Sequence, residues 1–456
     1  MTLRTRIRKE QITSGSAQDG YKLTADGVGG VSWEFGGSAE IAIDDVSNPP
    51  TEAQLITAFG TPDAFANDRK IGVVNDAASG NSAYAVFSDG GHYWLLPLAK
   101  ATETILSVEV MSSTTIAETV DGNWYGRAEL QDLGNGTWVL VYREGTSHPS
   151  HDGVIHIRFT NDYCSTWTAE DTDLDGNAVS EFPAYPDGAA PEDGYEAGIA
   201  LLILAPNGTL YMFVQKVDYA IPLYDGTYYK TSTDNGVTWS ASWTKLEIDG
   251  HDSTFHGDYF ILDGDIYAVG SDETGDDYLF KSSDNGSIWE TVSIIAEEED
   301  SVGEPGMEYL GNSTILVIFR DNGNAKTYKT ISTDMGETWS ALTEIQSAVE
   351  VLGRPRLSTR AHLKGYANWW TDSVIIMAAY EHITPGDSTP RRNAVWISQD
   401  RGDTWDGPNY TDAETEDAGY GDIAYDAMNG YYVYIVTQGT QAAASVKQYN
   451  LTITGI

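Results

Sequence analysis

The segment YREGTSHPSHDGVIH gathers residue types that can do acid–base chemistry. It holds three histidines, His148, His151 and His156, with Arg143 and Asp152 beside them. Histidine exchanges protons near neutral pH and also binds metals, and arginine pairs with carboxylates. No zinc-site spacing is present. The segment therefore indicates proton transfer on an acidic ligand, with a plain histidine-containing loop as the other interpretation.

A second acidic segment, DTDLDGN at residues 171–177, suggests a calcium loop. Carboxylate-rich loops of this kind can supply the oxygen ligands that calcium prefers. The segment lacks the glutamate that closes an EF-hand loop at its twelfth position, so a solvated acidic loop is the alternative. We expect no cofactor, and the structural calcium stays open.

A repeated phrase indicates which elements position these residues. STDNGVTWS, SSDNGSIWE, STDMGETWS and SQDRGDTWD each join a polar turn to a tryptophan, and TNDYCSTWT is a more distant copy. Asp and Gly suit a tight turn, and Trp can bury a large area beside it. A catalytic device is not needed five times, so we expect a scaffold role. The residues are Asp162, Asp234, Asp284, Asp334 and Asp400, with Trp239, Trp289, Trp339 and Trp405.

The spacing of these aspartates predicts an all-β fold, a six-bladed β-propeller over residues 103–456. They lie 72, 50, 50 and 66 residues apart, and a period near 50 with four strands per unit is typical of propeller blades. The last group has three strands, at 422–425, 431–437 and 445–454. We expect the segment at 105–110 to supply the fourth and close the ring.

The N-terminal part of the chain differs from the repeats. GSAQDGYKLTADGVGGVSWEF, within residues 1–50, resembles the attachment segments of bacteriophage tail fibres and tailspikes. The resemblance implies a virion-attachment segment. Residues 51–102 are expected to form a small β connector module, with strands at 71–75, 83–88 and 93–98.

The repeated phrase, S-x-D-x-G-x-T-W, resembles the Asp-box, or BNR repeat, of sialidases (neuraminidases). In that family three arginines grip the substrate carboxylate, an Asp is the acid/base, and a Tyr–Glu pair supplies the nucleophile. A tyrosine can attack only if a nearby carboxylate helps to remove its proton. Asp-box propellers also include glycan binders, lyases and proteins without activity.

The resemblance assigns roles to single residues. GRAEL resembles the family's opening strand and places Arg127 as the first arginine, with Asp152 in the following loop as acid/base. GEPGMEYLGNSTILVIFRDN resembles the next motif and gives Glu304 and Arg320. Tyr420, in AGYGDIAYD, is then the nucleophile.

The third arginine is the open position. TPRRNAVWISQD offers Arg391 or Arg392 before the last repeat, whereas GRPRL offers Arg354 and Arg356. The chain also departs from the family where R-I-P after the first arginine is R-A-E. Arg143 and His148 crowd the loop of Asp152 and are further candidates for contact with substrate.

The net charge of the chain restricts the classes of partner it can bind. The chain has 68 acidic and 26 basic residues, a net charge of −42, which argues against nucleic-acid binding and attachment to anionic membranes. Its one cysteine excludes an intrachain disulfide, and it shows no apolar run near 18 residues and no signal peptide.

Taken with the two resemblances, these features predict a homotrimeric tail protein of a phage particle, made in the host cytoplasm. It would bind host-surface glycan through the propeller and other virion proteins through the N-terminus. Three roles for the propeller stay open. They are a sialidase-type hydrolase of acidic glycan, a non-catalytic receptor-binding or structural protein, and a polysaccharide lyase using His, Tyr and Arg.

Overall fold

The computed structural model describes residues 21–25, 31–35, 72–74, 83–88, 93–98, 107–119, 122–146, 153–179, 182–183, 195–218, 223–321, 326–345, 351, 353–359, 365–366, 374–382, 391–411, 418–439 and 443–454. The chain divides into two compact units, Met1–Thr104 and Ile105–Ile456. In the described residues no helix is long and apolar enough to cross a membrane.

The first unit contains two small antiparallel sheets. β1 (Tyr21–Ala25) pairs with β2 (Val31–Phe35) across a Gly-rich turn sequence. β3 (Gly72–Val74), β4 (Ala83–Ser88) and β5 (Tyr93–Leu98) pair in chain order. These three strands lie where the sequence predicted strands, at 71–75, 83–88 and 93–98.

The second unit is built from six antiparallel blades, of which the second and third belong to one continuous sheet that β24 (Gly365–Tyr366) also joins. The first blade has β7 (Trp124–Gly134), β8 (Thr137–Gly145), β9 (Val154–Thr160) and β10 (Phe182–Pro183). The second has β11 (Tyr195–Leu204), β12 (Leu210–Asp218), β13 (Leu223–Ser232) and β14 (Thr244–Ile248). The third has β15 (His251–Leu262), β16 (Asp265–Asp272), β17 (Asp277–Ser282) and β18 (Glu290–Ala296).

The other three blades repeat this plan. The fourth has β19 (Val302–Gly311), β20 (Thr314–Asp321), β21 (Thr327–Ser332) and β22 (Thr343–Glu344). The fifth has β23 (Arg356–Thr359), β25 (Ile375–His382), β26 (Arg391–Ser398) and β27 (Asp406–Tyr410). The sixth has β28 (Ala418–Asp426), β29 (Tyr431–Gln438), β30 (Ser445–Thr454) and β6 (Ser107–Glu118).

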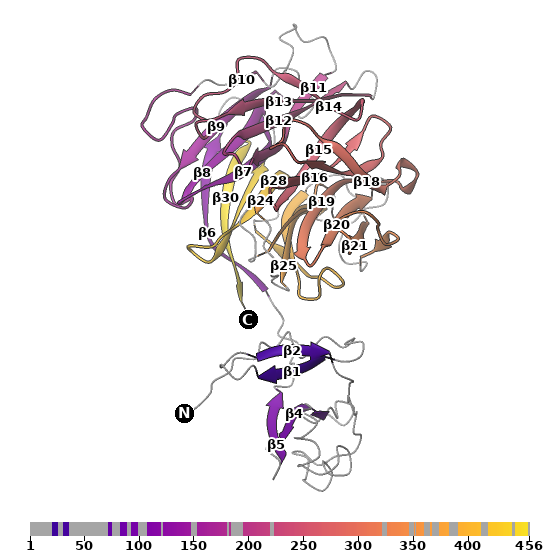
Figure 1. Ribbon diagram of the computed structural model, residues 1–456. Coiled ribbons are helices and arrows are strands. Elements are labelled where there is room, and N and C mark those ends of the chain that lie inside the picture. The colour runs from indigo at the N-terminus through magenta and orange to yellow at the C-terminus, as the bar shows by residue number, and fades with distance from the viewer. Residues whose placement is uncertain are drawn as a thin grey trace. The chain divides into compact units, whose positions relative to one another are not determined.

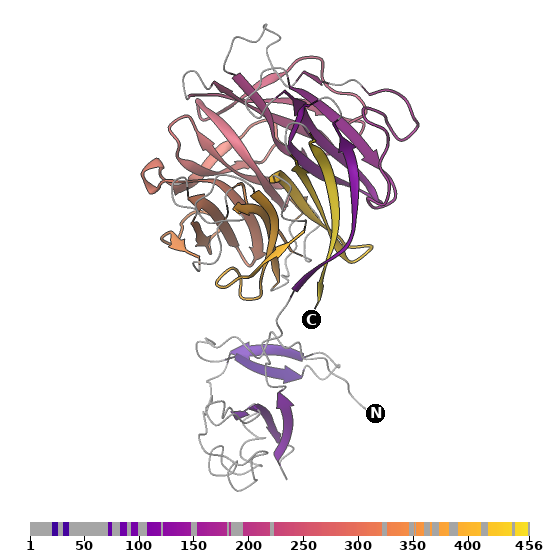
Figure 2. The same cartoon turned by 180° about the vertical axis from the view of Figure 1, so that it is seen from behind.

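The blades close into a ring, as Figures 1 and 2 show. The first strands of the blades, β7, β11, β15, β19, β23 and β28, each contact the next, and β28 contacts β7. We call these six the inner strands. The last blade is completed by β6, which comes from the start of the unit and pairs with β30 at its end. Six blades and this closure confirm the sequence prediction.

One apolar cluster lies between each pair of neighbouring blades. Phe213 of the second blade meets Phe255 of the third, with ring centroids 4.9 Å apart. Corresponding clusters join the other neighbours, and the last one joins Val433 of the sixth blade to Leu140 of the first. Burial of this apolar surface is the main source of stability for such a ring.

The repeated turns are structural, as predicted. Asp334 accepts hydrogen bonds from Ser332 Oγ at 2.7 Å and from the backbone N–H and hydroxyl of Thr338. These bonds, with the Thr338 hydroxyl first, lower the pKa of Asp334 to about 2. The same pattern recurs around Asp162, Asp234 and Asp400, while Asp284 faces Ile288, which has no hydroxyl.

The tryptophans complete these turns. Trp239, Trp289 and Trp405 donate their indole N–H to the carbonyl of the turn glycine, and Trp339 donates to Ser293. Trp289 packs at 4.8 Å from Phe255 of its own blade and also faces Phe213 of the preceding blade. The phrase therefore fastens neighbouring blades as well as its own turn.

Candidate functional site

The inner strands bring polar residues to the centre of the ring. Five of the six strands carry a pair of described polar or small residues two positions apart where the strand register shifts by a β-bulge. The sixth pair is Arg354, just before β23, and Arg356, its first residue. A bulge re-aims side chains that would otherwise alternate across the sheet. We call the two sets the first tier (Arg127, Gly198, His256, Glu304, Arg354, Tyr420) and the second tier (Glu129, Ala200, Asp258, Gly306, Arg356, Asp422).

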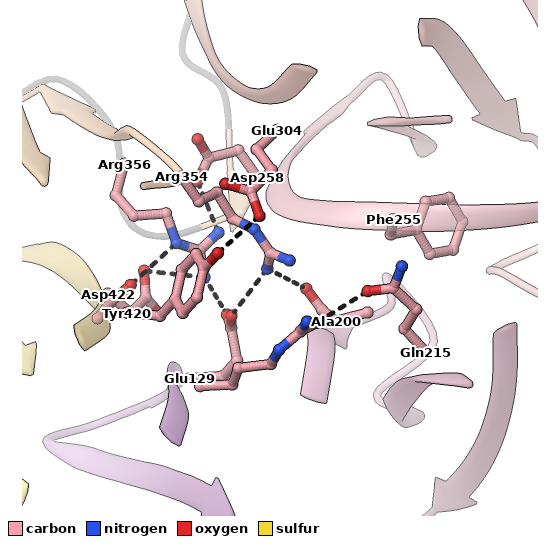
Figure 3. A network of polar contacts seen from close by, with 12 residues as sticks. Glu129, Ala200, Gln215, Phe255, Asp258, Glu304, Arg354, Arg356, Tyr420 and Asp422 are labelled. Carbon is pink, nitrogen blue, oxygen red and sulfur yellow. Dashed lines mark hydrogen bonds and ion pairs between the residues drawn. The ribbon is translucent and has the colours of Figure 1, made fainter. Parts of the chain in front are cut away.

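Arg356 holds the second tier together (Figure 3). Its guanidinium contacts Glu129 of the first blade, Asp258 of the third at 3.1 Å, and Asp422 of the sixth at 3.7 Å. Contacts with three different blades are possible only at the ring centre. Arg356 is 1% exposed. Burial alone would lower the pKa of its guanidinium group, but the three surrounding carboxylates outweigh burial and raise that pKa. Arg356 therefore joins the blades and is not open to an anionic ligand.

The first tier is centred on Tyr420 and Glu304. The Tyr420 hydroxyl donates to Glu304 Oε1 at 2.7 Å. Arg320, on β20, approaches Glu304 Oε2 with its Nε at 2.6 Å. Tyr420 is half-buried, and the side chains of Arg320 and Glu304 are 29% and 17% exposed, so this part of the cluster is open to solvent.

Two more arginines surround Tyr420. The guanidinium carbons of Arg127 and Arg354 lie 5.6 and 5.7 Å from the centre of its ring. Arg127 donates to Gln215 Oε1 at 2.8 Å, and Arg354 donates to the carbonyl of Ala200 at 3.2 Å, as Figure 3 shows for Arg354. Three arginines thus converge on one tyrosine–glutamate pair.

Charge differs between the tiers. Around the first tier, the guanidinium groups of Arg127, Arg354 and neighbouring Arg320 surround Tyr420 and the carboxylate of Glu304, and Arg354 also lies 3.8 Å from Glu129 of the second tier. In the second, the single guanidinium of Arg356 faces three carboxylates. The net negative charge of the second tier balances the net positive charge around Tyr420 at short range, because the protein interior screens charges weakly. The first tier is therefore suited to bind an anion, and guanidinium groups pair best with planar carboxylates.

The backbone of the first tier is unusual. Arg127 and Glu304 have φ values of 51° and 50°, in the left-handed region that side chains avoid. Glycine supplies the space: a Cβ on Gly198 would stand 2.4 Å from Arg127 Cδ. The energetic cost of such a backbone conformation is tolerated where it holds functional side chains in position.

The protonation states of Tyr420 and Glu304 are set by burial and by the arginines. Burial, followed by the Glu304 carboxylate, raises the pKa of Tyr420 well above its usual value. Burial would also raise the pKa of Glu304, but the charges of Arg320 and Arg354 outweigh it and lower that pKa. Near neutral pH the pair is therefore a phenol hydrogen-bonded to a carboxylate.

The candidates for the third arginine lie at different places in the fifth blade. Arg391 and Arg392 are on β26, the third strand. Arg391 stacks on Tyr380 at 5.3 Å and Arg392 on Tyr410 at 3.6 Å. Tyr380 in turn meets Tyr420 edge to face at 5.6 Å, so Arg391 borders the cluster, whereas Arg354 stands beside Tyr420 itself.

The histidine-rich segment is only partly described. Asp152, His148 and His151 lie outside the described residues. His156, on β9, contacts Asp171 at 2.8 Å and Glu144 at 3.1 Å. Arg143 is fully buried between Trp124 and Gly153.

The acidic loop at 171–177 closes on itself. Asp173 Oδ1 accepts the backbone N–H groups of Asp175 and Asn177, and Oδ2 accepts the Asn177 side chain at 3.1 Å. These carboxylate oxygens are occupied by the loop's own donors. The geometry of Asp173 is that of a hydrogen-bonded turn.

Sequence reasoning missed several members of the cluster. Glu129, Asp258 and Asp422 in the second tier, and His256 in the first, were not among the candidates. A signal existed: R-A-E, H-G-D, R-P-R and Y-G-D are i, i+2 pairs of polar residues at corresponding places in the inner strands. Alignment of the repeats by their first strands, in place of their turns, would have found them.

One protein family and several solved structures are similar to this chain. The profile of the family described as BNR repeat-like domain matches residues 136–363. A search of curated protein sequences finds no significant match. A protein of unknown function from Dyadobacter fermentans is similar in structure, with a TM-score of 0.56 and 15% identity, over 76% of this chain and 99% of that one.

Two sialidases are also similar in structure. The NanB sialidase of Streptococcus pneumoniae has a TM-score of 0.54 and 12% identity, over 76% of this chain and 71% of that one. The Trypanosoma rangeli sialidase, in complex with 2,3-difluorosialic acid as a covalent intermediate, has a TM-score of 0.51 and 13% identity, over 74% of this chain and 59% of that one. At these identities the likeness shows a shared sialidase-like propeller fold.

Proposed function

Because this chain belongs to the BNR repeat-like domain family, we propose that its first tier binds the carboxylate of a sialic-type acidic sugar and hydrolyses the adjoining glycosidic bond. The observation that carries the proposal is the hydrogen bond between Tyr420 and Glu304, at 2.7 Å, inside a group of three arginines. The family match and the fold make the proposal coherent, and the geometry of this chain's own residues supplies its argument.

Binding of the sugar precedes the chemical step. Arg127, Arg320 and Arg354 supply the guanidinium groups that hold the sugar carboxylate. Glu304 keeps Arg320 in place from the other side. Fixed charges of this kind need no rearrangement when the ligand arrives, and they orient the anomeric carbon beside the carboxylate.

The chemical step uses the neutral phenol. Tyr420 Oη attacks the anomeric carbon while its proton passes to Glu304, and the bond to the leaving oxygen breaks. A carboxylate nucleophile would be repelled by the sugar's own carboxylate on that carbon, whereas a phenol is not. Water then releases the sugar from Tyr420. The T. rangeli sialidase, which has a similar fold, was captured as a covalent intermediate with 2,3-difluorosialic acid.

The leaving oxygen also needs a proton. Asp152 remains our proposed donor, on the sequence resemblance alone, because it follows the segment of Arg127 in the sequence, between β8 and β9. His148 belongs to the same stretch of sequence and is proposed to contact the ligand.

A second candidate is binding without turnover, as part of a phage tail protein. It is favoured by the phrase that precedes and includes the β1–β2 hairpin, which resembles tail-fibre attachment segments. In this proposal the N-terminal part joins other virion proteins, the particle carries a homotrimer, and the first tier recognises host-surface glycan. Adhesion of a particle requires affinity but not catalysis.

Hydrolysis of a 4-methylumbelliferyl sialoside distinguishes the candidates. Wild-type protein is expected to release the fluorophore, and Tyr420→Phe is expected to bind the sialoside without cleaving it. Tyr425→Phe, on the same strand but packed on Tyr432, is the matched control and should remain active. Binding without cleavage by wild type supports the second candidate, and failure to bind at all overturns both.

A further inference from the structure

One ionisable side chain of the first tier has no place in the mechanism above. His256 lies on β15, two residues before Asp258 of the second tier, and is 4% exposed. Its Nε2 is 2.6 Å from Ser271 Oγ, and that hydroxyl donates to Asp277 Oδ1 at 2.6 Å. Ser271 and Asp277 are buried too, on β16 and β17. The chain His256–Ser271–Asp277 thus runs outward from the ring centre across one blade.

The other ring nitrogen of His256 faces no protein partner. Nδ1 is buried and has no hydrogen-bond partner among the described residues. Nε2 is taken by Ser271 of the second strand of the blade, which leaves Nδ1 as the nitrogen available to a ligand. The charges that act most on this imidazole are those of Arg354 and Glu304, followed by Arg127 and Arg320, all members or neighbours of the first tier. A buried nitrogen without a partner is uncommon and needs an explanation, and a ligand held by the neighbouring first tier can supply one.

The imidazole is uncharged in this environment. Burial, reinforced by the positive charge of Arg354, lowers the pKa of His256 to about 3. A neutral ring adds no charge to the arginine group, and it offers one hydrogen bond of fixed direction. The ligand group that fits the neutral His256 ring is therefore an uncharged hydrogen-bonding group and not a second anion.

We propose that His256 is a further ligand-binding residue, which contacts through Nδ1 a hydroxyl or acylamido group of the sugar whose carboxylate the arginines hold. Ser271 and Asp277 are positioning residues that fix the ring through Nε2. The inference rests on the proposed function and extends it, because it assigns a specificity contact to the third blade. Position supports it: His256 is the counterpart, on its inner strand, of Arg127, Glu304, Arg354 and Tyr420.

Two substitutions separate the nitrogens. In His256→Asn the side-chain amide reproduces the position of Nδ1 but cannot reach Ser271. In His256→Gln the amide reaches the position of Nε2 and leaves Nδ1 unreplaced. Titration with N-acetylneuraminic acid should give His256→Gln an affinity at least about tenfold below wild type, and His256→Asn one within about threefold. Thermal unfolding of both variants checks that the fold is kept.

The titrations distinguish failure of this inference from failure of the proposed function. Wild type that binds the sugar while both variants bind equally well overturns this inference and leaves the proposed function intact. A larger loss in His256→Asn than in His256→Gln also overturns it, since the Ser271 contact would then be the important one. Wild type that does not bind overturns the proposed function and this inference with it.

A measurement on wild-type protein guards against variants that fail to fold. Nitrogen-15 spectra identify His256 as the imidazole that stays neutral down to pH 4. Adding N-acetylneuraminic acid should shift its Nδ1 resonance and leave the resonance of exposed His251 unchanged. An unchanged Nδ1 resonance at saturating sugar contradicts the proposal.

Discussion

Arg127 and Glu304 carry positive φ values on strands that are otherwise extended, and both side chains end beside Tyr420. The residue types were predictable, because the motifs around them resemble those of sialidases. Their backbone conformation was not, since a β-bulge depends on pairing with the next strand and leaves no mark on either residue. The same limit leaves the third arginine open between Arg391 or Arg392 and Arg354 or Arg356 in the sequence: distance along the chain does not show which strand is innermost.

Gly198→Ala tests the fit of Arg127 against its neighbouring strand. The added Cβ would stand 2.4 Å from Arg127 Cδ, so the guanidinium must move away from Tyr420. Because a charged hydrogen bond contributes about 1.5–3 kcal/mol, we expect affinity for N-acetylneuraminic acid to fall about 10- to 100-fold. Calorimetric titration measures it, and an unchanged affinity would show that Arg127 does not contact the ligand.

Arg354→Ala and Arg392→Ala form a matched pair. Removal of Arg354 deletes one of the three central guanidinium groups, so sialoside binding should weaken about 10- to 100-fold. Arg392 stacks on Tyr410 outside the cluster and should be neutral for binding. Equal effects of the two substitutions on the dissociation constant would contradict the proposed role of Arg354 in binding.

At the scale of elements, the repeated turn was the most informative part of the sequence. Its Asp, Gly and Trp act within about eight residues, so local chemistry fixes their conformation and sequence alone suffices to find them. The inner strands depend on neighbouring blades, and Glu129, Asp258 and Asp422 contact Arg356 from three of them. Such long-range contacts cannot be deduced from the spacing of one motif.

Ile288→Thr should repair the incomplete turn of the third blade. Asp284 accepts Ser282 and the Ile288 N–H, while a threonine hydroxyl occupies the corresponding place beside Asp234, Asp334 and Asp400. Ile288 is 71% exposed, so little packing is lost. We expect a gain of about 0.5–1.5 kcal/mol in the free energy of unfolding. The reverse change, Thr338→Ile, should lower Tm, and a lower Tm for Ile288→Thr would argue against the structural role of the hydroxyl.

At the scale of the whole molecule, the ring is closed by strands from its two ends. β6 pairs with β30, and an apolar cluster joins the sixth blade to the first. The sequence allowed this prediction because the last repeat lacked one strand and an unassigned apolar segment stood before the first repeat.

Two truncations test the closure. A chain lacking residues 1–104 keeps β6 and should unfold in one cooperative transition with unchanged sialoside affinity. A chain lacking residues 1–119 loses β6, which leaves β30 as an unpaired edge prone to association. We expect a lower Tm and aggregation for the second chain in thermal scanning and light scattering. Equal stability of the two would show that β6 is dispensable for the ring.

Asp277 should make the stability of the ring depend on pH. Burial raises the pKa of Asp277 to about 8, whereas an unfolded Asp titrates near 3.9. Between these values the folded protein keeps a proton that the unfolded chain has released. The contribution of Asp277 to the free energy of unfolding is thus present below pH 4 and falls by up to about 1.4 kcal/mol per pH unit as pH rises toward 8.

Asp277→Asn removes this titration while keeping an oxygen that can accept the Ser271 hydroxyl. Its Tm should therefore decline less than that of wild type between pH 5 and 9. Asp265→Asn, on the partner of Lys281, is the control, because the hydrogen bond from Lys281 lowers the pKa of Asp265. Parallel curves for wild type and Asp277→Asn would contradict the buried, protonated state of this carboxyl.

The most direct test of the central claim is peptide mass spectrometry after incubation with 2,3-difluorosialic acid. If the Tyr420 hydroxyl attacks the anomeric carbon and fluoride leaves, the peptide that contains Tyr420 should gain the mass of the fluorinated sugar. Tyr420→Phe should remain unmodified, and Tyr425→Phe should be labelled like wild type. An unmodified Tyr420 peptide in wild-type protein at saturating reagent, or a sugar attached to another residue, would contradict the account.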